Sequence, residues 1–514
     1  MRSPGVQDGP RGDTARERLM KARDYQQECC DRLIDAMAVG HRWILCTLFT
    51  GAGKTVIFSL LAKMLCNSKI LIIAPMRELV WQAADTADRV TGEYTDVEMA
   101  GAWGQDGRVT VASALTLLRG RYKRFLGVRV IIIDECHTQF SPAFLAMLRE
   151  FVEAGGYVIG FTATPFRMDG KPLMEVYEHE AFHMAAEDGI DQGWCVPPLA
   201  KIVRCRHFKM TDVRVTGGDF SAADLDLIMG AARPLSELCV TIQRERRGAA
   251  IAFLPGVASA RALAEMAPKY GINAAFVCGD KSIQPEEERK QIITRYRQGD
   301  LDLLCNCQVA TMGFDAPITE TIFMARPTKS LVLALQIYGR AMRPLPGVVD
   351  GLETAEERRA AIAASDKPTF RIIDITDSVA DHRLVTAVDM FVKEPSLREF
   401  AREAAGEAGE PASEEDLLAQ AAEKLRKAKL IEEGLRALHG QAEAELHSEE
   451  VSIRGQKKDI ADYKVPLRGR YAGKRMGDLP DGFIDWALRQ PTIKGWQRSY
   501  FRREKQRRSA LQHA

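Results

Sequence analysis

Six consecutive residues near the start of the chain have the types and the order that bind a nucleoside triphosphate. They follow an apolar run at Ile44–Leu48, precede a helix-like segment, and are Thr50, Gly51, Ala52, Gly53, Lys54 and Thr55. In such a stretch the glycines let backbone N–H groups face phosphate oxygens, the lysine reaches the β- and γ-phosphates, and the last hydroxyl binds Mg²⁺. The strict pattern has a further glycine where this chain has Leu48, but the inner glycines that make the phosphate cradle are present.

An acidic pair follows a second apolar strand. Residues Val130–Ile133 lead directly into Asp134 and Glu135. At the carboxyl edge of a sheet, beside the phosphate loop, Asp134 can hold Mg²⁺ through water and Glu135 can orient or deprotonate the attacking water. Acids also commonly end strands on solvated loops, but a position at least one α/β unit after a phosphate loop favours catalysis. Because Glu135 then serves as the base, His137 is expected to couple the nucleotide to domain motion.

Two arginines late in the chain have the spacing of a pair that stabilises phosphoryl transfer. Arg340 and Arg343 lie three residues apart, so on the predicted helix they share a face. An arginine at the γ-phosphate typically raises the rate by ~10³–10⁵. An ordinary salt-bridged helix face is the alternative, and the setting between Gln336 and Pro344 favours the catalytic interpretation. Gln336 is expected to act with His137 as a coupler.

Taken in order, these motifs resemble those of the superfamily 2 helicases. Asp134–His137 and Phe161–Pro165 resemble motifs II and III of that superfamily. Further similarities are found at Arg23 and Gln26 (the adenine-reading element), Ala74–Leu79 (motif Ia), Val111–Ala114 (motif Ib), Thr311–Pro317 (motif V) and Gln336–Pro344 (motif VI). The resemblance includes eight ordered motifs and covers about residues 20–390.

The resemblance implies roles for residues whose chemistry is not evident from spacing alone. ATP and Mg²⁺ are the implied cofactors, with Thr55 and Asp134 as the metal ligands. Arg23, Gln26, Gly313 and Asp315 are expected to complete the ATP site. Contacts to the nucleic-acid backbone are expected from Arg77, Ser113 and Thr311, because the loops of motifs Ia, Ib and V ring the strand groove.

Within the superfamily, the chain is most similar to bacterial and phage DNA helicases of the RadD and XPB-type branch. The similarity lies in the Gln-x-x-Gly-Arg-x-x-Arg-Pro form of motif VI, the Leu48/Phe49 form of motif I and the segment Gly217–Phe220. DEAD-box RNA helicases typically have Asp-Glu-Ala-Asp instead, and a histidine at the start of motif VI. RadD-type relatives often carry a C-terminal zinc element, whereas this sequence has no cysteine after Cys307.

Short apolar, β-branched runs alternate with longer amphipathic segments such as Arg77–Val90, which predicts parallel sheets covered by helices. A first series comprises Ile44–Leu48, Lys69–Ala74, Arg108–Ala112, Val130–Ile133 and Tyr157–Phe161. A second comprises Ala249–Leu254, Ala274–Val277, Leu301–Cys305, Thr321–Ala325 and Phe370–Ile375. The fold class we expect is α/β, with two tandem RecA-like doubly wound parallel-sheet domains and a C-terminal helical and small basic module.

Charge and composition suggest the domain boundaries. Residues 394–453 have 7 basic and 15 acidic residues, and residues 454–514 have 16 basic and 6 acidic ones. We expect a flexible N-terminus (1–19), a first RecA-like ATP-binding domain (20–205), a linker (206–245), a second RecA-like domain (246–392), an acidic helical connector (393–453) and a basic module (454–514). Glu414–Leu438 reads as one charged helix packed on the second domain, with a coiled coil as the alternative.

The basic module resembles a small module found at the end of exonuclease-X-like proteins and some phage proteins. Phe483, Ile484 and Trp486 are expected to form its core. Its other aromatic residues could stack bases and are Tyr471, Trp496, Tyr500 and Phe501. Phosphate contacts or a frayed tail are expected from Arg502, Arg503, Lys505, Arg507 and Arg508.

Composition excludes several classes of protein. With 514 residues, 46% of them hydrophobic, and a net charge of +1, the chain has the make-up of a multidomain globular protein rather than a disordered one. No apolar run approaches the roughly 18 residues that span a bilayer. The eleven cysteines are scattered, which suits reduced buried thiols, and Cys305 and Cys307 read as core rather than as a zinc site. A cytoplasmic location is expected, in a bacterium or encoded by a phage.

The function expected from these features is that of an ATP-dependent DNA helicase or translocase, a nucleic-acid-dependent ATPase. Its partner would be single-stranded, forked or duplex DNA, with RNA kept as an alternative and no membrane involved. Two other functions stay open: a motor subunit of a restriction or defence complex, and an ATP-switched clamp that holds DNA without unwinding it.

Overall fold

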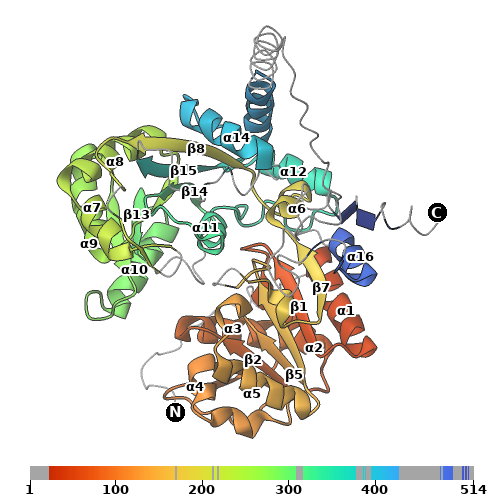
Figure 1. The fold of residues 1–514 in the computed structure, drawn as a ribbon. Helices are drawn as coiled ribbons and strands as arrows, with labels where there is room; N and C mark the ends of the chain where they lie inside the picture. The colour runs from red at the N-terminus through yellow and green to blue at the C-terminus, as the bar shows by residue number, and fades with distance from the viewer. Residues whose placement is uncertain are drawn as a thin grey trace, which may run out of the picture. The chain divides into compact units, whose positions relative to one another are not determined.

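The computed structural model describes residues 22–167, 171–210, 213–216, 219–307, 316–377, 386, 388, 395–427, 475, 478–489, 501–502, 504–505 and 508. The chain forms two compact units, residues 1–393 with 398–421, and residues 394–397 with 422–514. The first unit contains two parallel sheets with their helices, as Figure 1 shows. The second contains the basic module.

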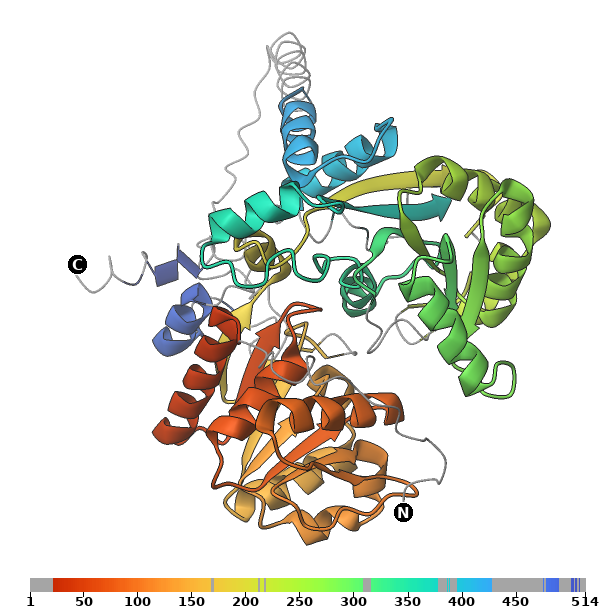
Figure 2. The ribbon, with the colours of Figure 1, turned by 180° about the vertical axis from the view of Figure 1, so that it is seen from behind.

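The first sheet has seven strands in the order β3-β4-β2-β5-β6-β1-β7, all paired in parallel. Its strands are β1 (Trp43–Leu48), β2 (Ile70–Ala74), β3 (Asp96–Glu98), β4 (Val109–Ser113), β5 (Val130–Ile133), β6 (Tyr157–Thr162) and β7 (His179–Met184). β2 and β6 are buried at every position, because helices cover both faces of the sheet (Figure 2). Those helices are α1 (Asp24–Val39), α2 (Lys54–Met64), α3 (Arg77–Thr91), α4 (Ala114–Leu118) and α5 (Pro142–Glu153).

The second sheet has six parallel strands in the order β12-β13-β11-β14-β15-β8. They are β8 (Pro198–Cys205), β11 (Ala249–Phe253), β12 (Ala274–Cys278), β13 (Leu303–Cys307), β14 (Thr319–Met324) and β15 (Phe370–Asp377). Its helices are α7 (Ala222–Met229), α8 (Ala232–Glu245), α9 (Val257–Met266), α10 (Glu286–Arg297), α11 (Leu331–Tyr338) and α12 (Ala355–Ala363). The chain therefore has the predicted α/β fold class, two doubly wound parallel sheets followed by C-terminal helices.

Every strand predicted from the sequence is present, with ends displaced by at most two residues. The prediction missed β3, β7, β8 and the two-residue strands β9 and β10. β3 has only three residues and two of them are acidic, and β7 mixes histidine and glutamate with apolar residues. β8 differs most from expectation, because the predicted boundary put it in the first domain whereas it pairs with β15 at the edge of the second sheet. The two strands are far apart in the sequence, so no local sequence pattern indicates that they pair.

The predicted linker is largely part of the second domain. It contains the hairpin strands β9 (Val215–Thr216) and β10 (Asp219–Phe220), followed by α7 and α8. Buried residues of these helices, including Leu225 and Leu238, join the core of the second sheet. Asp219 accepts hydrogen bonds from the Thr328 hydroxyl (2.6 Å) and the Lys329 backbone N–H (2.7 Å), which fixes the turn before α11. Gly217 and Gly218 lie outside the described residues.

The start of the acidic connector packs on the second sheet. α14 (Pro395–Glu407) and the helical residues 414–427 bury Ala401, Ala405 and Leu417, and Ala412 pairs with Ala200 of β8. This agrees with the predicted packing of the charged helix on the second domain. The part of that predicted helix after residue 427 lies outside the described residues.

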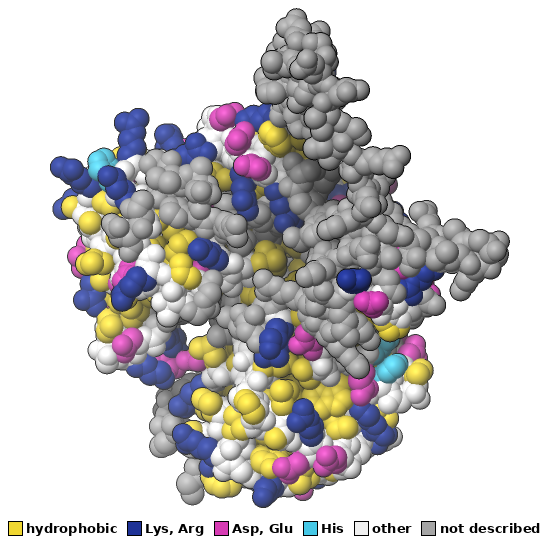
Figure 3. All heavy atoms as spheres, viewed as in Figure 1, with side chains coloured by type: hydrophobic (Ala, Val, Ile, Leu, Met, Phe, Trp, Pro, Cys, Tyr) yellow, Lys and Arg dark blue, Asp and Glu magenta, His cyan; other side chains and the backbone are white. Residues whose placement is uncertain are grey.

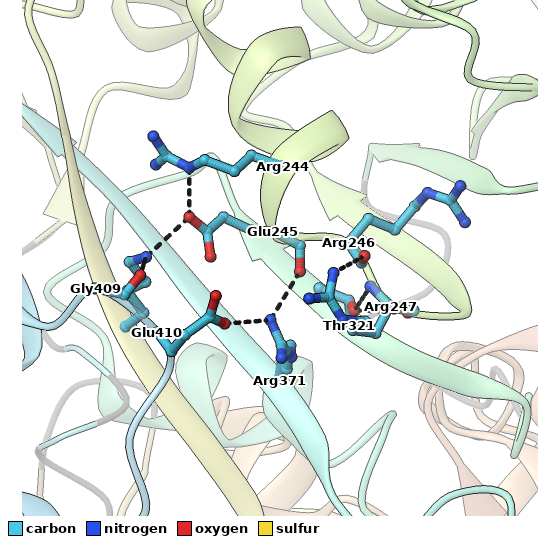
Figure 4. Close-up of polar contacts among 9 residues, drawn as sticks. Arg244, Glu245, Arg246, Arg247, Thr321, Arg371, Gly409 and Glu410 are labelled. Carbon is cyan, nitrogen blue, oxygen red and sulfur yellow. Dashed lines mark hydrogen bonds and ion pairs between the residues drawn. The ribbon is translucent and has the colours of Figure 1, made fainter.

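Buried charges fasten the connector to the edge of the second sheet. The Lys201 ammonium lies 2.9 Å from Oε1 of Glu245 and also donates to the Gly409 carbonyl. Arg371 lies 3.4 Å from Glu410 and donates to the carbonyl of Glu245, and Arg244 binds the same glutamate (Figure 4). Because an open strand edge invites pairing with other chains, the connector protects β8.

The basic module of the second unit has a small apolar core. Leu479, Phe501 and residues Ile484 and Ala487 of α16 (Asp481–Arg489) are buried, and the rings of Phe483 and Phe501 lie 6.1 Å apart. The core role predicted for Phe483 and Ile484 is confirmed. The prediction that Phe501 could stack a base is wrong, because its side chain is fully buried. The Trp486 side chain is not among those described, and Tyr471, Trp496 and Tyr500 lie outside the described residues.

Two of the module's predicted phosphate-binding cations already have acidic partners. Lys505 lies 2.7 Å from Asp485, and Arg508 lies 2.8 Å from Glu504. Arg502 is exposed, whereas Arg503 and Arg507 lie outside the described residues. Lys505 and Arg508 would therefore have to exchange these acidic partners for phosphates in order to bind a polyanion.

Two further features bear on the composition arguments. In the part of the chain that the structure describes, no helix is long and apolar enough to cross a membrane. Cys305 and Cys307 are both buried in β13, which agrees with their interpretation as core residues. Figure 3 shows Lys and Arg side chains interspersed with acidic and hydrophobic ones on the face in view, as expected for a net charge of +1.

Candidate functional site

The phosphate loop lies between β1 and α2, at the carboxyl edge of the first sheet. Gly51 and Gly53 have φ angles of 96° and 75°, a left-handed conformation that favours glycine. Gly53 is the N-cap of α2 and provides no side chain to cap the helix. The backbone N–H groups of the first turn, from Lys54 and Thr55 onward, therefore suit an anion such as a phosphate.

Lys54 and Glu135 form an ion pair in the middle of this site. The Lys54 ammonium lies 3.1 Å from Oε1 of Glu135, and both side chains are largely buried. Burial opposes ionisation of Glu135, but the charge of Lys54, together with its hydrogen bond, holds the pKa of Glu135 below the usual value. Glu135 is therefore a carboxylate at neutral pH, as a group that orients or deprotonates water must be.

Asp134 has the environment of a metal ligand. Burial and the neighbouring Glu135 charge raise the pKa of Asp134 to about 7, so the free carboxylate lacks compensating positive charge. A cation would supply it, and a carboxylate together with the Thr55 hydroxyl is the oxygen donor set that Mg²⁺ prefers. These residues fit Mg²⁺.

His137 joins the acidic pair to motifs III and VI. Its Nδ1 lies 3.1 Å from the Thr162 hydroxyl and 3.4 Å from Oε2 of Glu135, and its Nε2 lies 3.2 Å from the Gln336 side-chain nitrogen. Burial lowers the pKa of His137, so the ring is neutral at physiological pH. The Gln336 amide then donates to Nε2 and the proton sits on Nδ1, facing Thr162 and Glu135. The two predicted couplers are thus in direct contact.

Motif VI lies directly over the phosphate loop. A Cβ placed on Gly51 would lie 3.2 Å from Cγ of Arg343, and one placed on Gly339 would lie 2.3 Å from Cβ of Thr50. The approach at Gly339 leaves no room for a side chain, and at Gly51 the left-handed φ angle also favours glycine. Arg340 lies near enough to Glu135 to lower the pKa of that carboxyl. Both predicted arginines therefore reach the site.

The helix predicted to carry both arginines is wrong in its extent. α11 ends at Tyr338, and Arg340 and Arg343 lie in the turns that follow. Pro344 disfavours a helical conformation at the residue before it. The carbonyl of Met342 accepts the Val196 N–H (2.8 Å), so the backbone here serves tertiary contacts instead of a helix.

Lys367 is a site residue that the sequence analysis missed. Its ammonium is almost fully buried and donates to the carbonyls of Arg343 (2.9 Å) and Pro317 (2.7 Å). It therefore holds the end of motif V and the backbone of motif VI together. A single lysine between a turn and a strand gives no sequence signal for this role.

The predicted adenine-reading element packs on the phosphate loop. Gln26 is buried, accepts the Arg23 backbone N–H (3.1 Å) and donates to the Ala52 carbonyl (3.2 Å), and the Tyr25 hydroxyl donates to that same carbonyl (2.7 Å). The Arg23 guanidinium lies 4.9 Å from the ring centroid of Trp194. Trp194, which the sequence analysis missed, borders this end of the site.

The predicted nucleic-acid contacts are only partly described. Arg77 is exposed as the first residue of α3, and Ser113 ends β4. β2 and β4 are neighbours, so both residues lie at the same edge of the sheet as the phosphate loop. Thr311, Gly313 and Asp315 of motif V lie outside the described residues.

Together, a phosphate loop after β1, an acidic pair after β5 and two arginines after α11 define a P-loop nucleoside triphosphatase built on two RecA-like sheets. Residues 19–167 match the family of the type III restriction enzyme, res subunit, and residues 233–344 match the helicase conserved C-terminal domain. The chain belongs to the superfamily 2 helicases.

Curated relatives agree with this assignment. The chain is 31% identical over 346 residues to the ATP-dependent helicase IRC3 of Saccharomyces cerevisiae, covering 62% of this chain and 49% of that protein. It is 30% identical over 353 residues to the mitochondrial helicase irc3 of Schizosaccharomyces pombe (65% and 57%) and 25% identical over 339 residues to the DNA 3'-5' helicase Rad25 of Haloarcula marismortui (63% and 51%). The chain thus spans about half the length of these relatives.

Two solved structures share the fold. One is a fragment of an HsdR subunit of a type I restriction enzyme from Vibrio vulnificus, with a TM-score of 0.52 and 22% identity over 72% of this chain and 66% of that one. The other is the type ISP restriction-modification enzyme LlaBIII bound to DNA, with a TM-score of 0.50 and 14% identity over 70% of this chain and 28% of that one.

Proposed function

We propose that this chain is an ATP-driven motor that translocates on DNA and unwinds it. The observation that carries the proposal is the unbroken series of contacts from Gln336 through His137 and Glu135 to Lys54. It joins the second sheet to the phosphate loop of the first. A nucleotide that changes any member of the series can therefore change how the two sheets hold a strand.

The ion pair between Lys54 and Glu135 suggests how the site responds to ATP. Lys54 turns toward the β- and γ-phosphates when they enter, and this releases Glu135 to orient and deprotonate the attacking water. Arg343, which crosses the phosphate loop, and Arg340 stabilise the negative charge that develops on the transferred phosphoryl group. Bound Mg²⁺, held by Thr55 and Asp134, would neutralise part of the phosphate charge.

The change in the site on hydrolysis is then transmitted to the second domain through His137. When the ion pair between Glu135 and Lys54 forms again, the electric field at the neutral His137 ring changes. The hydrogen bond between His137 and Gln336 changes with it. Arg77 and Ser113 of the first domain would hold the nucleic-acid backbone in alternation with Thr311 of the second domain, so that opening and closing of the two domains move the strand.

DNA is the proposed track, in single-stranded, forked or duplex form. The relative Rad25 is named as a DNA helicase, and motif VI resembles that of the RadD and XPB-type branch. RNA is the alternative, because a DeaD RNA helicase of Mycobacterium tuberculosis is 24% identical over 278 residues. We propose a bacterial or phage-encoded cytoplasmic protein whose C-terminal module resembles that of exonuclease-X-like proteins.

The test is the ATPase rate with single-stranded DNA, duplex DNA, forked DNA and RNA as separate stimulants. DNA should accelerate hydrolysis and RNA should not, and a labelled fork should lose its displaced strand only when ATP is present. Glu135→Gln is the matched control, because it should bind ATP and DNA but stop turnover. Stimulation by RNA alone would overturn the DNA assignment, and DNA-stimulated hydrolysis without strand displacement or movement would favour a clamp.

A second candidate function is the motor subunit of a restriction or defence complex. The family match of residues 19–167 to the type III restriction enzyme, res subunit, favours it. Purification of the tagged chain from its own host would test this, with co-purification of a nuclease at fixed stoichiometry as the supporting result.

A further inference from the structure

An exposed tryptophan stands out on the first domain. Trp103 lies in the loop between β3 and β4, and 63% of its surface is exposed. The Arg121 guanidinium lies 3.6 Å from the centre of its ring, and that of Arg124 lies 5.8 Å away. A large aromatic ring stacked on one side by a cation, with the remainder open to solvent, is a surface that a second planar group can cover.

Two buried carboxylates hold this loop in place. Glu98 is fully buried, lies 2.7 Å from Arg121 and 3.1 Å from Arg124, and accepts the Gly104 backbone N–H at 3.0 Å. Asp96 accepts the backbone N–H groups of residues 105 and 107 at 2.8 and 2.6 Å. Charge-assisted hydrogen bonds of this kind are strong, so the ring is displayed by an ordered loop rather than by a loose one.

Display on an ordered loop favours binding. The conformational entropy of the loop and of the Arg121 side chain is already lost before any partner arrives. The Arg121 guanidinium also donates to the carbonyls of Met99 and Ala102, which fixes its plane under the ring. Binding of a partner on Trp103 therefore loses little further conformational entropy of the protein.

The position and charge of the surface indicate the kind of partner. Glu98 is in register with Ala112 of β4, which directly precedes Ser113, so the loop starts beside the predicted strand groove. The segment from Ala114 to Gly127 contains no acidic residue and four cations, Arg119, Arg121, Lys123 and Arg124. Arg119 and Lys123 are exposed, and so is Arg124, which also pairs with Glu98. An aromatic face among cations fits a polyanion that carries planar bases.

We propose that Trp103, seated on Arg121, is a stacking platform for one base of a single nucleic-acid strand held on the first domain. The assignment rests on the proposed function, since it presumes that the chain binds nucleic acid. The platform would contact a base, whereas Arg77 and Ser113 would contact the nucleic-acid backbone. Because every base has a flat face, the platform reads no sequence.

The test is the affinity of the full chain for a fluorescein-labelled oligothymidine and for the same oligonucleotide with abasic sites throughout, measured by anisotropy. Trp103→Ala should weaken binding to oligothymidine roughly ten-fold, as expected for the loss of one base–aromatic stack, and should leave binding to the abasic strand unchanged. Trp103→Phe should restore most of the difference.

Two controls separate stacking from other effects. Tyr94→Ala removes an aromatic side chain that is 73% exposed just before β3, and should change neither affinity. Trp103→Ala should leave the salt dependence of binding unchanged, because a base stack releases no counterions, whereas Arg119→Ala should make it shallower.

The outcomes distinguish this proposal from the proposed function. If the unaltered chain binds neither strand, the proposed function fails. The other case is that the unaltered chain binds both strands. The stacking platform alone is then overturned if Trp103→Ala weakens binding to oligothymidine and to the abasic strand equally, or if it weakens binding to neither strand. The second of these results would leave a protein partner as the occupant of the surface.

Discussion

Lys54 contributes to the site before any nucleotide is bound, because it is the cation that lies against Glu135. Lys54→Ala should abolish ATP turnover, since the variant lacks the charge that meets the β- and γ-phosphates. Without that cation the pKa of Glu135 should also rise, because Lys54 is the largest favourable contribution to its ionised form. Steady-state ATPase assays and the pH dependence of any residual rate measure both effects.

Thermal unfolding without nucleotide is the control for this variant. The melting temperature should fall modestly, because the largely buried Glu135 loses its ion-pair partner, but unfolding should stay cooperative, since Lys54 lies at the start of α2 and outside the apolar core. A variant that keeps near-normal ATPase activity would show that residues 50–55 are not the phosphate loop.

Residues in contiguous motifs could be predicted from the sequence, and isolated ones could not. Lys54 and Glu135 sit at fixed offsets from the ends of β1 and β5, so a strand and the turn after it indicate their place. Lys367 acts on the Arg343 carbonyl 24 residues away, and Trp194 acts on Arg23 across the first domain. Such roles depend on tertiary contacts that leave no periodic pattern.

At the scale of elements, the turn after α11 presents Arg343 to the phosphate loop. Arg343→Ala and Arg340→Ala should slow hydrolysis more than they weaken ATP binding, because the developing charge of the transition state is what the guanidiniums stabilise. Single-turnover hydrolysis and nucleotide binding, measured separately, test this. Equal losses in affinity and in rate constant would indicate a plain binding role.

The segment that connects the two sheets, between β7 and β8, also contacts the predicted adenine-reading element. It runs through α6 (Ala186–Asp191) to β8, and Trp194 in it lies against Arg23 on one side and 3.8 Å from the Arg358 guanidinium of α12. Arg358 in turn donates to the carbonyl of Gln192 (2.8 Å). The connection therefore touches both the adenine-reading element and the second domain.

Trp194→Ala should raise the KM for ATP several-fold and also lower kcat, because Arg23 and Arg358 both lose their common stacking partner. Trp194→Phe should retain most of both constants, since a smaller ring still fills the space between the cations. A loss of active fraction with an unchanged KM would mean that Trp194 serves only the stability of the fold.

Strands made of continuous apolar residues were predictable, including the edge strand β12, whereas edge strands that contain charged residues were not. β2 and β6 lie inside the first sheet and read as continuous apolar runs. β3 and β8 are edge strands with charged residues at positions that a sequence pattern assigns to loops. These charges have partners inside the protein: Asp96 and Glu98 hold the loop that precedes β4, and Lys201 pairs with Glu245.

At the scale of the whole molecule, the basic module is separate from the unit that carries every described motif. Deletion of residues 455–514 removes most of a segment with a local balance of +10 and no motif residue. The truncated chain should still hydrolyse ATP at the full rate when it is saturated with DNA. Its affinity for DNA should fall, and the fall should shrink as salt rises.

The salt dependence is the decisive measurement for this deletion. Each phosphate contact contributes roughly 0.7–0.9 to the slope of log affinity against log salt, because binding releases condensed counterions. Lys505 and Arg502 are both exposed, but Lys505 lies 2.7 Å from Asp485, so Lys505→Ala should alter that slope less than Arg502→Ala. If the truncated and full-length chains have the same slope, the module does not touch nucleic acid, and docking to a protein becomes the better account of its charge.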